Sequence, residues 1–293
     1  MFVLLFCCTI VSSVSAQIDD EIVKVEASLV VLNASIMDRD GRAVTGLKRP
    51  HFRIFEDGVE QEILMFEAEE TPFAAVILID SSGSMEDRIV LARSAAIQFI
   101  QGMRPGDVAA IYNFASKLEL VQEFSNDGFV REQVFELKSR GMTVLNDAVY
   151  KAAEELSGRP EKRKAILVIS DGADTMSRRS SDQALKAALA ANATIYTVDM
   201  SSFNTGQSDR MQNQAVLKNF AEKSGGRFIS TPGGVAMRDA FKRIVEELRV
   251  QYTLAYQPSN TKTDGKWRAI ELRISKPALS IRTRKGYNAP KRK

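Results

Sequence analysis

The sequence predicts an α/β fold in which helices cover both faces of a mostly parallel β-sheet. In residues 73–250, short apolar segments rich in β-branched residues alternate with longer segments of helical periodicity. Such alternation is typical of a parallel sheet, whose strands are buried on both faces. The residues on either side show two-residue alternation and turn dipeptides instead, which predicts a small flanking antiparallel β module.

The N-terminal segment differs in character from the rest of the chain. Met1–Ala16 has no charged side chain, begins apolar and ends in small residues, which predicts a secretory signal peptide cleaved before Gln17. Both cysteines, Cys7 and Cys8, lie within it, and an exported chain without disulfides is common in bacteria. No later segment is apolar enough to span a membrane. We therefore expect a periplasmic or extracellular protein without a stable membrane span in its mature chain.

Residues 17–70 are expected to supply the N-terminal strands of the β module. Val23–Leu29 alternates apolar and polar side chains, and His51–Phe55 and Gln61–Phe66 also have strand-like composition. The dipeptides Asp40-Gly41 and Asp57-Gly58 predict turns between these strands.

The central region, residues 73–250, is expected to form the main domain. Its expected strands are Ala74–Ile79, Val108–Phe114, Ala165–Ile169 and Thr194–Val198, with Leu118–Phe124 as a short edge strand. Its expected helices are Ile89–Met103, Asp147–Leu156, Ser181–Ala191, Met211–Ser224 and Ala236–Val250. The last helix is amphipathic, and its apolar stripe predicts core packing.

Residues 251–288 return to a β pattern, followed by a basic tail. The expected strands are Tyr252–Tyr256, Arg268–Ile274 and Leu279–Thr283, and the tail Ala289–Lys293 is expected to fray. Neither flanking β segment is large enough to hold a good core alone. We therefore expect the two segments to pair into one module, with the central domain inserted between them.

The most specific pattern in the chain, Asp-x-Ser-x-Ser, directly follows the first central strand. It places one acid, Asp80, and two hydroxyls, Ser82 and Ser84, in one loop. Thr143 precedes a helical pattern, and Asp171 follows another apolar strand. Because the carboxyl ends of parallel strands share one edge of a sheet, we expect these loops to come together there. Carboxylate and hydroxyl oxygens are hard ligands that suit Mg²⁺, Mn²⁺ or Ca²⁺.

This order of residues resembles the metal-ion-dependent adhesion site (MIDAS) of von Willebrand factor type A (VWA) domains. The resemblance covers about residues 73–250 and implies a Rossmann-like domain that binds proteins through a divalent ion. It implies that Ser82, Ser84 and Thr143 are hydroxyl ligands. It also implies that Asp80 and Asp171 hold the ion directly or through water, and that an acidic side chain of a partner takes the remaining position.

Two further expectations come from resemblance. The helix of residues 236–250 could slide and tune the metal site, as the family likeness implies. The chain is also similar to a group of acidobacterial VWA-related proteins, through its export signal, its β segments and the dipeptides Trp267-Arg268 and Gly286-Tyr287.

The chemistry of the five candidate ligands favours Mg²⁺. Two carboxylates nearly balance a divalent charge, and neutral hydroxyls leave the ion able to attract another anionic oxygen. Mg²⁺ keeps several waters in octahedral geometry, whereas Ca²⁺ usually takes more oxygens, so Mn²⁺ and Ca²⁺ are the alternatives. We expect an exported, non-enzymatic adhesion or scaffold module whose protein partner presents Asp or Glu to the loops around Ser84, Thr143 and Asp171.

Three other functions stay open. The segment Lys262–Lys293 holds 11 basic and 2 acidic residues and could bind an anionic surface or nucleic acid, although a solvated face is the commoner role and no nucleic acid is expected. A metal held by two Asp residues could support phosphoester hydrolysis, or could only stabilise the fold. Against an enzyme, the only histidine, His51, lies in the β region, and no Walker A or zinc-type motif is present. Asp174 lies near Asp171 and could support the ligands from behind, but it is interpreted as a solvated loop residue.

Overall fold

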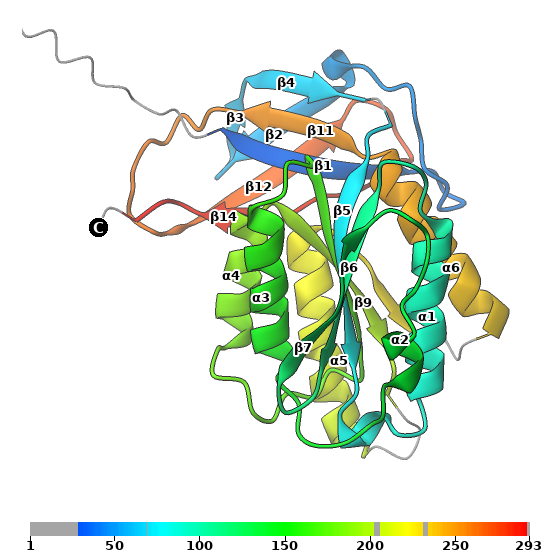
Figure 1. Ribbon diagram of the computed structural model, residues 1–293. Helices are drawn as coiled ribbons and strands as arrows, with labels where there is room; N and C mark the ends of the chain where they lie inside the picture. The colour runs from blue at the N-terminus through cyan, green and yellow to red at the C-terminus, as the bar shows by residue number, and fades with distance from the viewer. Residues whose placement is uncertain (1–28, 69, 202–205, 231–233, 292–293) are drawn as a thin grey trace, which may run out of the picture.

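A six-stranded sheet forms the centre of the structure (Figure 1). Its order is β10-β9-β8-β5-β6-β7, and all neighbours are parallel except the β6–β7 pair at one edge. The computed structural model describes residues 29–68, 70–201, 206–230 and 234–291. The strands are β5 (Phe73–Asp80), β6 (Val108–Phe114), β7 (Leu118–Ser125), β8 (Arg163–Ser170), β9 (Ala193–Asp199) and β10 (Phe228–Ser230). The predicted mostly parallel sheet is confirmed.

Helices cover both faces of this sheet, as predicted. Along β5, Ala75 and Ile77 pack against α1 and α6, whereas Val76 and Leu78 pack against the α3, α4 and α5 side. Each strand therefore needs apolar residues on both faces, which explains its unbroken apolar run. The helices are α1 (Ile89–Gly102), α2 (Gln133–Glu136), α3 (Leu145–Ser157), α4 (Ser181–Ala190), α5 (Gln207–Ser224) and α6 (Gly234–Arg249), with 3₁₀ turns η1 (Arg49–His51) and η2 (Gly83–Met85).

The β segments before and after the central domain combine into two four-stranded antiparallel sheets, which we call the β module. Their orders are β13-β1-β11-β4 and β14-β12-β2-β3, so each sheet contains strands from both ends of the chain. The strands are β1 (Val30–Met37), β2 (Phe52–Glu56), β3 (Val59–Gln61), β4 (Ile63–Glu67), β11 (Tyr252–Tyr256), β12 (Trp267–Ile274), β13 (Ser280–Arg282) and β14 (Gly286–Asn288). One shared apolar core, including Leu32, Ile54 and Leu254, lies within this module.

The two dipeptides near the C-terminus meet across neighbouring strands. Arg268 of β12 is opposite Tyr287 of β14, and the backbone of Gly286 lies against the Trp267 ring. A Cβ added at Gly286 would lie 2.3 Å from the Arg268 carbonyl oxygen and 2.4 Å from a ring atom of Trp267, so no larger residue fits there without displacing both the backbone and the ring. The buried Arg268 guanidinium pairs with Asp264.

The two ends of the chain and several short elements differ from the sequence predictions or lie outside the described residues. The signal peptide and most of the strand expected at Val23–Leu29 lie outside the described residues, and the first described strand begins at Val30. The expectation that the chain frays from Ala289 is wrong for the described part of the tail: the Ala289 N–H donates to the Lys266 carbonyl, and Lys291 forms a bridge with Asp264. The short elements α2, β3, β10 and β14 were not predicted, because none is long enough to show a clear period.

The β module lies at one end of the central sheet, opposite the edge where β5 and β9 end (Figure 1). A buried polar network joins the two parts. Glu247 of α6 accepts hydrogen bonds from Ser35 of β1 (2.8 Å), Arg282 of β13 (2.6 Å) and Tyr196 of β9 (3.1 Å). At the same end, the buried Arg163 guanidinium donates to main-chain carbonyls where α6 leads into β11. These contacts anchor the C-terminal end of α6.

Candidate metal centre

The loops that carry the five candidate ligands are joined by hydrogen bonds at the carboxyl edge of the sheet. Asp80 is the last residue of β5, and the η2 turn begins three residues later, at Gly83. The Gly83 N–H donates to the Gly141 carbonyl (3.1 Å), which ties the η2 turn to the loop before α3. The Ser170 hydroxyl donates to Asp80 Oδ2 (2.6 Å), which ties the end of β8 to the end of β5.

Asp80 is a fully buried carboxylate at the base of this edge. Its Oδ1 atom accepts the Ser82 N–H (2.8 Å) and its Oδ2 atom accepts the Ser170 hydroxyl. Burial raises the pKa of Asp80 to about 6, against the opposing effect of these hydrogen bonds, and the nearby Asp171 adds to the increase. A buried negative charge with one hydrogen bond on each oxygen still has lone pairs that a cation could use.

The two serine hydroxyls have the separation expected of neighbouring metal ligands. Ser82 Oγ and Ser84 Oγ are 3.1 Å apart. Adjacent oxygens around an octahedral Mg²⁺, each at 2.0–2.1 Å from the ion, are about 3 Å apart. Ser82 is buried and Ser84 is exposed, so the hydroxyl pair extends from the base of the site to solvent. The donor chemistry and this spacing fit a small hard cation.

Thr143 is held in place through its backbone. Its N–H donates to the Thr175 hydroxyl (2.9 Å), and its carbonyl accepts the N–H groups of Thr175 and Met176. The loop after β8 therefore fixes the loop before α3. The Thr143 side chain makes no part of these bonds, which leaves its hydroxyl available for other contacts.

Three aspartates besides Asp80 lie at or near this edge, with different surroundings. Asp171 is buried and accepts the Ala173 N–H (3.0 Å). Asp174 is not a solvated loop residue: it is half-buried and accepts the N–H groups of Asn146 (2.9 Å) and Ser177 (3.0 Å), so it fixes the start of α3. Asp199, which the sequence reasoning did not single out, ends β9 and accepts hydrogen bonds from Ser201 and Gln214.

The candidate metal centre combines hydroxyl groups with carboxylates. Within the described residues, no group of three or more His, Cys, Asp or Glu side chains could hold a metal ion. Two of the five candidate ligands are carboxylates, and the other three are Ser or Thr hydroxyls.

Sequence reasoning missed two kinds of residue around the site. Ser170 and Thr175 support Asp80 and Thr143, and only their position beside the expected ligands could have signalled this role. Met142 and Met176 flank the Thr143 loop and are about half exposed, at 49% and 54%. Large apolar side chains on loops beside a polar site form a flexible surface suited to protein contacts.

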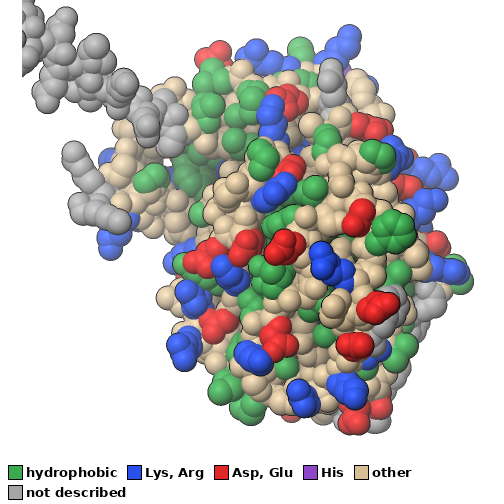
Figure 2. Space-filling view, in the orientation of Figure 1, with side chains coloured by type: hydrophobic (Ala, Val, Ile, Leu, Met, Phe, Trp, Pro, Cys, Tyr) green, Lys and Arg blue, Asp and Glu red, His purple; other side chains and the backbone are tan. Residues whose placement is uncertain are grey.

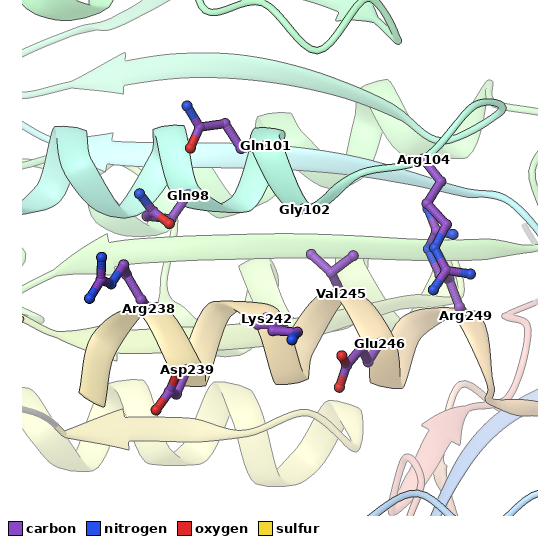
Figure 3. Close-up of a pocket in the computed structure, with 10 residues that line it drawn as sticks. All are labelled: Gln98, Gln101, Gly102, Arg104, Arg238, Asp239, Lys242, Val245, Glu246 and Arg249. Atoms are coloured by element: carbon purple, nitrogen blue, oxygen red, sulfur yellow. The ribbon is translucent and has the colours of Figure 1, made fainter. Parts of the chain in front are cut away.

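A groove elsewhere on the domain does not include the candidate ligands. Figure 3 shows it between α1 and α6, with Gln98 on one helix and Lys242 and Val245 on the other. Its volume is about 430 Å³, and none of the five candidate ligands lines it. His51 is also remote from them in the fold, since it hydrogen-bonds Lys48 within the turn before β2 of the β module.

The basic C-terminal segment is partly used in intramolecular contacts. Arg273 pairs with Glu271, Arg282 pairs with Glu247, and the buried Arg284 donates to the Leu189 carbonyl at the end of α4. Figure 2 shows basic and acidic side chains interspersed over the visible face of the molecule. These three arginines already have partners within the chain, which weakens the nucleic-acid alternative.

Comparisons with known proteins agree with this description. Residues 75–173 match the sequence model of the von Willebrand factor type A domain. A von Willebrand factor type A protein from Catenulispora acidiphila has a similar structure, with a TM-score of 0.50 and 13% identity over 91% of this chain and 75% of that chain. The vWF domain of the type V pili tip protein Mfa5 from Porphyromonas gingivalis has a TM-score of 0.50 and 14% identity over 61% of this chain and 95% of that chain. No curated protein sequence matches the chain.

Among the described residues, no helix is both long and apolar enough to cross a membrane.

Proposed function

Since the chain contains a von Willebrand factor type A domain, we propose that it is an exported, non-enzymatic protein-binding module of adhesion or scaffold type. In this proposal a divalent ion, preferably Mg²⁺, is held by Asp80, Asp171 and the hydroxyls of Ser82, Ser84 and Thr143. When bound, the ion supplies a positive charge that attracts an Asp or Glu side chain of a partner protein. One observation carries the proposal. The buried carboxylates of Asp80 and Asp171 occur at the same edge of the sheet as the Ser82 and Ser84 hydroxyls, whose oxygens are 3.1 Å apart and extend to solvent.

The protein's own groups have separate tasks in this function. Ser170 and the Ser82 N–H orient the Asp80 carboxylate, and Thr175 orients the Thr143 loop. The exposed Met142 and Met176 supply apolar contact area beside the point where the acidic side chain would enter. The β module lies at the opposite end of the sheet, so it leaves this face open to a partner (Figure 1).

Calorimetric titration of Mg²⁺ and Mn²⁺ into the mature chain, residues 17–293, tests the metal site. The matched control is Asp80→Ala, which leaves one carboxylate against a divalent charge and should abolish binding. Each titration is repeated with excess acetate, because the partner's carboxylate could be needed to hold the ion. Absence of binding with and without acetate would refute the proposal.

A second comparison separates adhesion from a purely structural metal. If Mg²⁺ raises the melting temperature of the wild type but acetate binding is unchanged on adding EDTA, the ion only stabilises the fold. Acetate binding that requires Mg²⁺ and disappears in Asp80→Ala supports capture of a partner carboxylate. We expect no phosphoesterase turnover with Mg²⁺ or Mn²⁺. Turnover by the wild type that Asp80→Ala abolishes would contradict the non-enzymatic assignment.

A further inference from the structure

A second pocket lies beside the candidate metal centre, and we call it the side pocket. Its volume is about 530 Å³, and its lining includes Ser81, Asn113, Lys138, Arg140 and Gly141. Ser81 directly follows Asp80, and Gly141 lies two residues before Thr143. The side pocket therefore shares its walls with two of the loops that carry the candidate metal ligands.

Backbone contacts make the wall between the two sites well defined. The Arg140 N–H donates to the Ser81 carbonyl (2.8 Å), and the Met142 N–H donates to the Ser116 hydroxyl (2.9 Å). Gly141 has φ +84°, and an added Cβ would lie 2.5 Å from Ser116 Oγ. The close approach of the β6–β7 turn to this loop thus requires glycine at position 141. A partner at the metal centre would meet a preformed side pocket.

The side pocket carries an excess of basic side chains. Its lining has three cations and two acids, and Lys117 is already paired with Glu119. Lys138 and Arg140 then face only one remaining acid, Glu136, and within the described part of the chain neither basic side chain has an ion-pair partner. Both are exposed, so they can reach a ligand without breaking an internal contact.

The base of the side pocket contains an unsatisfied polar group. Asn113 lies in β6 beside Phe114, is only 8% exposed, and its Oδ1 atom has no hydrogen-bond partner among the described residues. A buried amide group left without a partner costs about 1–3 kcal/mol.

We propose that the side pocket binds a second acidic side chain of the same partner segment, through Lys138 and Arg140. This inference rests on the proposed function, because the first acidic side chain is the one that the metal ion attracts. The preferred partner is therefore a polypeptide segment with two acidic side chains, which should bind more tightly than a segment with a single isolated Asp or Glu.

The test uses short capped Gly-Ser peptides that contain one central Asp. In a series of these peptides, a second Asp stands one to four residues to either side, and each has a control peptide with Asn at that position. Affinities are measured by NMR titration at saturating Mg²⁺ and again in EDTA. The protein variants are Lys138→Gln/Arg140→Gln and the matched control Arg39→Gln/Lys276→Gln, in which both changed residues are exposed on the β module.

At one spacing, the second Asp should strengthen Mg²⁺-dependent binding by about two- to fivefold over its Asn control, the effect of an exposed ion pair. Lys138→Gln/Arg140→Gln should lose this preference but bind the single-Asp peptide as the wild type does, whereas the control variant should keep it. If the two-Asp peptide has no advantage at any spacing, or if Lys138→Gln/Arg140→Gln keeps the advantage, the side-pocket inference is overturned and the proposed function is unaffected. Single-Asp binding that is absent, or unchanged in EDTA, would overturn the proposed function and with it this inference.

Discussion

Replacing Asp80 by Asn should stabilise the metal-free protein at neutral pH. The folded-state pKa of about 6 lies above the ordinary value of 3.8 because burial disfavours the carboxylate. Between these two values the folded state holds a proton on Asp80 that the unfolded state has lost, so the contribution of Asp80 to stability is most favourable below pH 4 and is lost as the pH rises through 6. Above that range the cost is about 3 kcal/mol. Asn avoids this cost, since it cannot ionise and can still accept the Ser82 N–H.

The assay is thermal unfolding followed by circular dichroism at pH 4 and pH 7.5, in EDTA and then in Mg²⁺. In EDTA, Asp80→Asn should have a melting temperature several degrees above the wild type at pH 7.5 and close to it at pH 4. In Mg²⁺ at a hundred times its Kd, the wild type should gain about 2.7 kcal/mol and the variant nothing. A variant less stable than the wild type in EDTA at pH 7.5 would refute the claim that the buried charge is destabilising.

Three further perturbations test other parts of the structure. Thr143→Ala should leave the melting temperature nearly unchanged but weaken Mg²⁺ or acetate binding by about tenfold or more; equal affinities by calorimetry would remove Thr143 from the site. Gly141→Ala should lower stability by about 1–3 kcal/mol, because φ is positive and Ser116 is too close, and urea denaturation would show a smaller loss if the loop can relax. Glu247→Gln should cost about 3 kcal/mol or more, since Arg282 loses its buried partner, with no change in Mg²⁺ affinity; an unchanged urea midpoint would contradict this assignment.

Several features of the fold could be predicted because they depend on local periodicity. The apolar run of β5 and the amphipathic pattern of α6 appear directly in the sequence, and both elements form nearly as predicted. The sequence also predicted that the loops of Asp80, Thr143 and Asp171 meet at one edge of the sheet, because parallel strands bring their carboxyl ends together. The metal-binding role of those residues stays a prediction, which the titrations described above test.

Other features depend on contacts between residues far apart in the chain. No local pattern shows that Ser170 orients Asp80, or that Asp174 accepts N–H groups from the start of α3. The side pocket likewise exists only because the β6–β7 turn approaches the loop at Gly141.

The sequence by itself determined the α/β class, the position of most strands and helices, and the choice of candidate oxygen ligands in the loops at the carboxyl edge of the sheet. These follow from side-chain periods and from chemistry within a few residues. Only the tertiary structure decided the pairing of β1 with β11, the Glu247 network that anchors the β module, and the basic side pocket beside the candidate metal centre. Such features depend on which surfaces pack together, and the burial of apolar area that drives this packing is non-directional and acts over the whole chain.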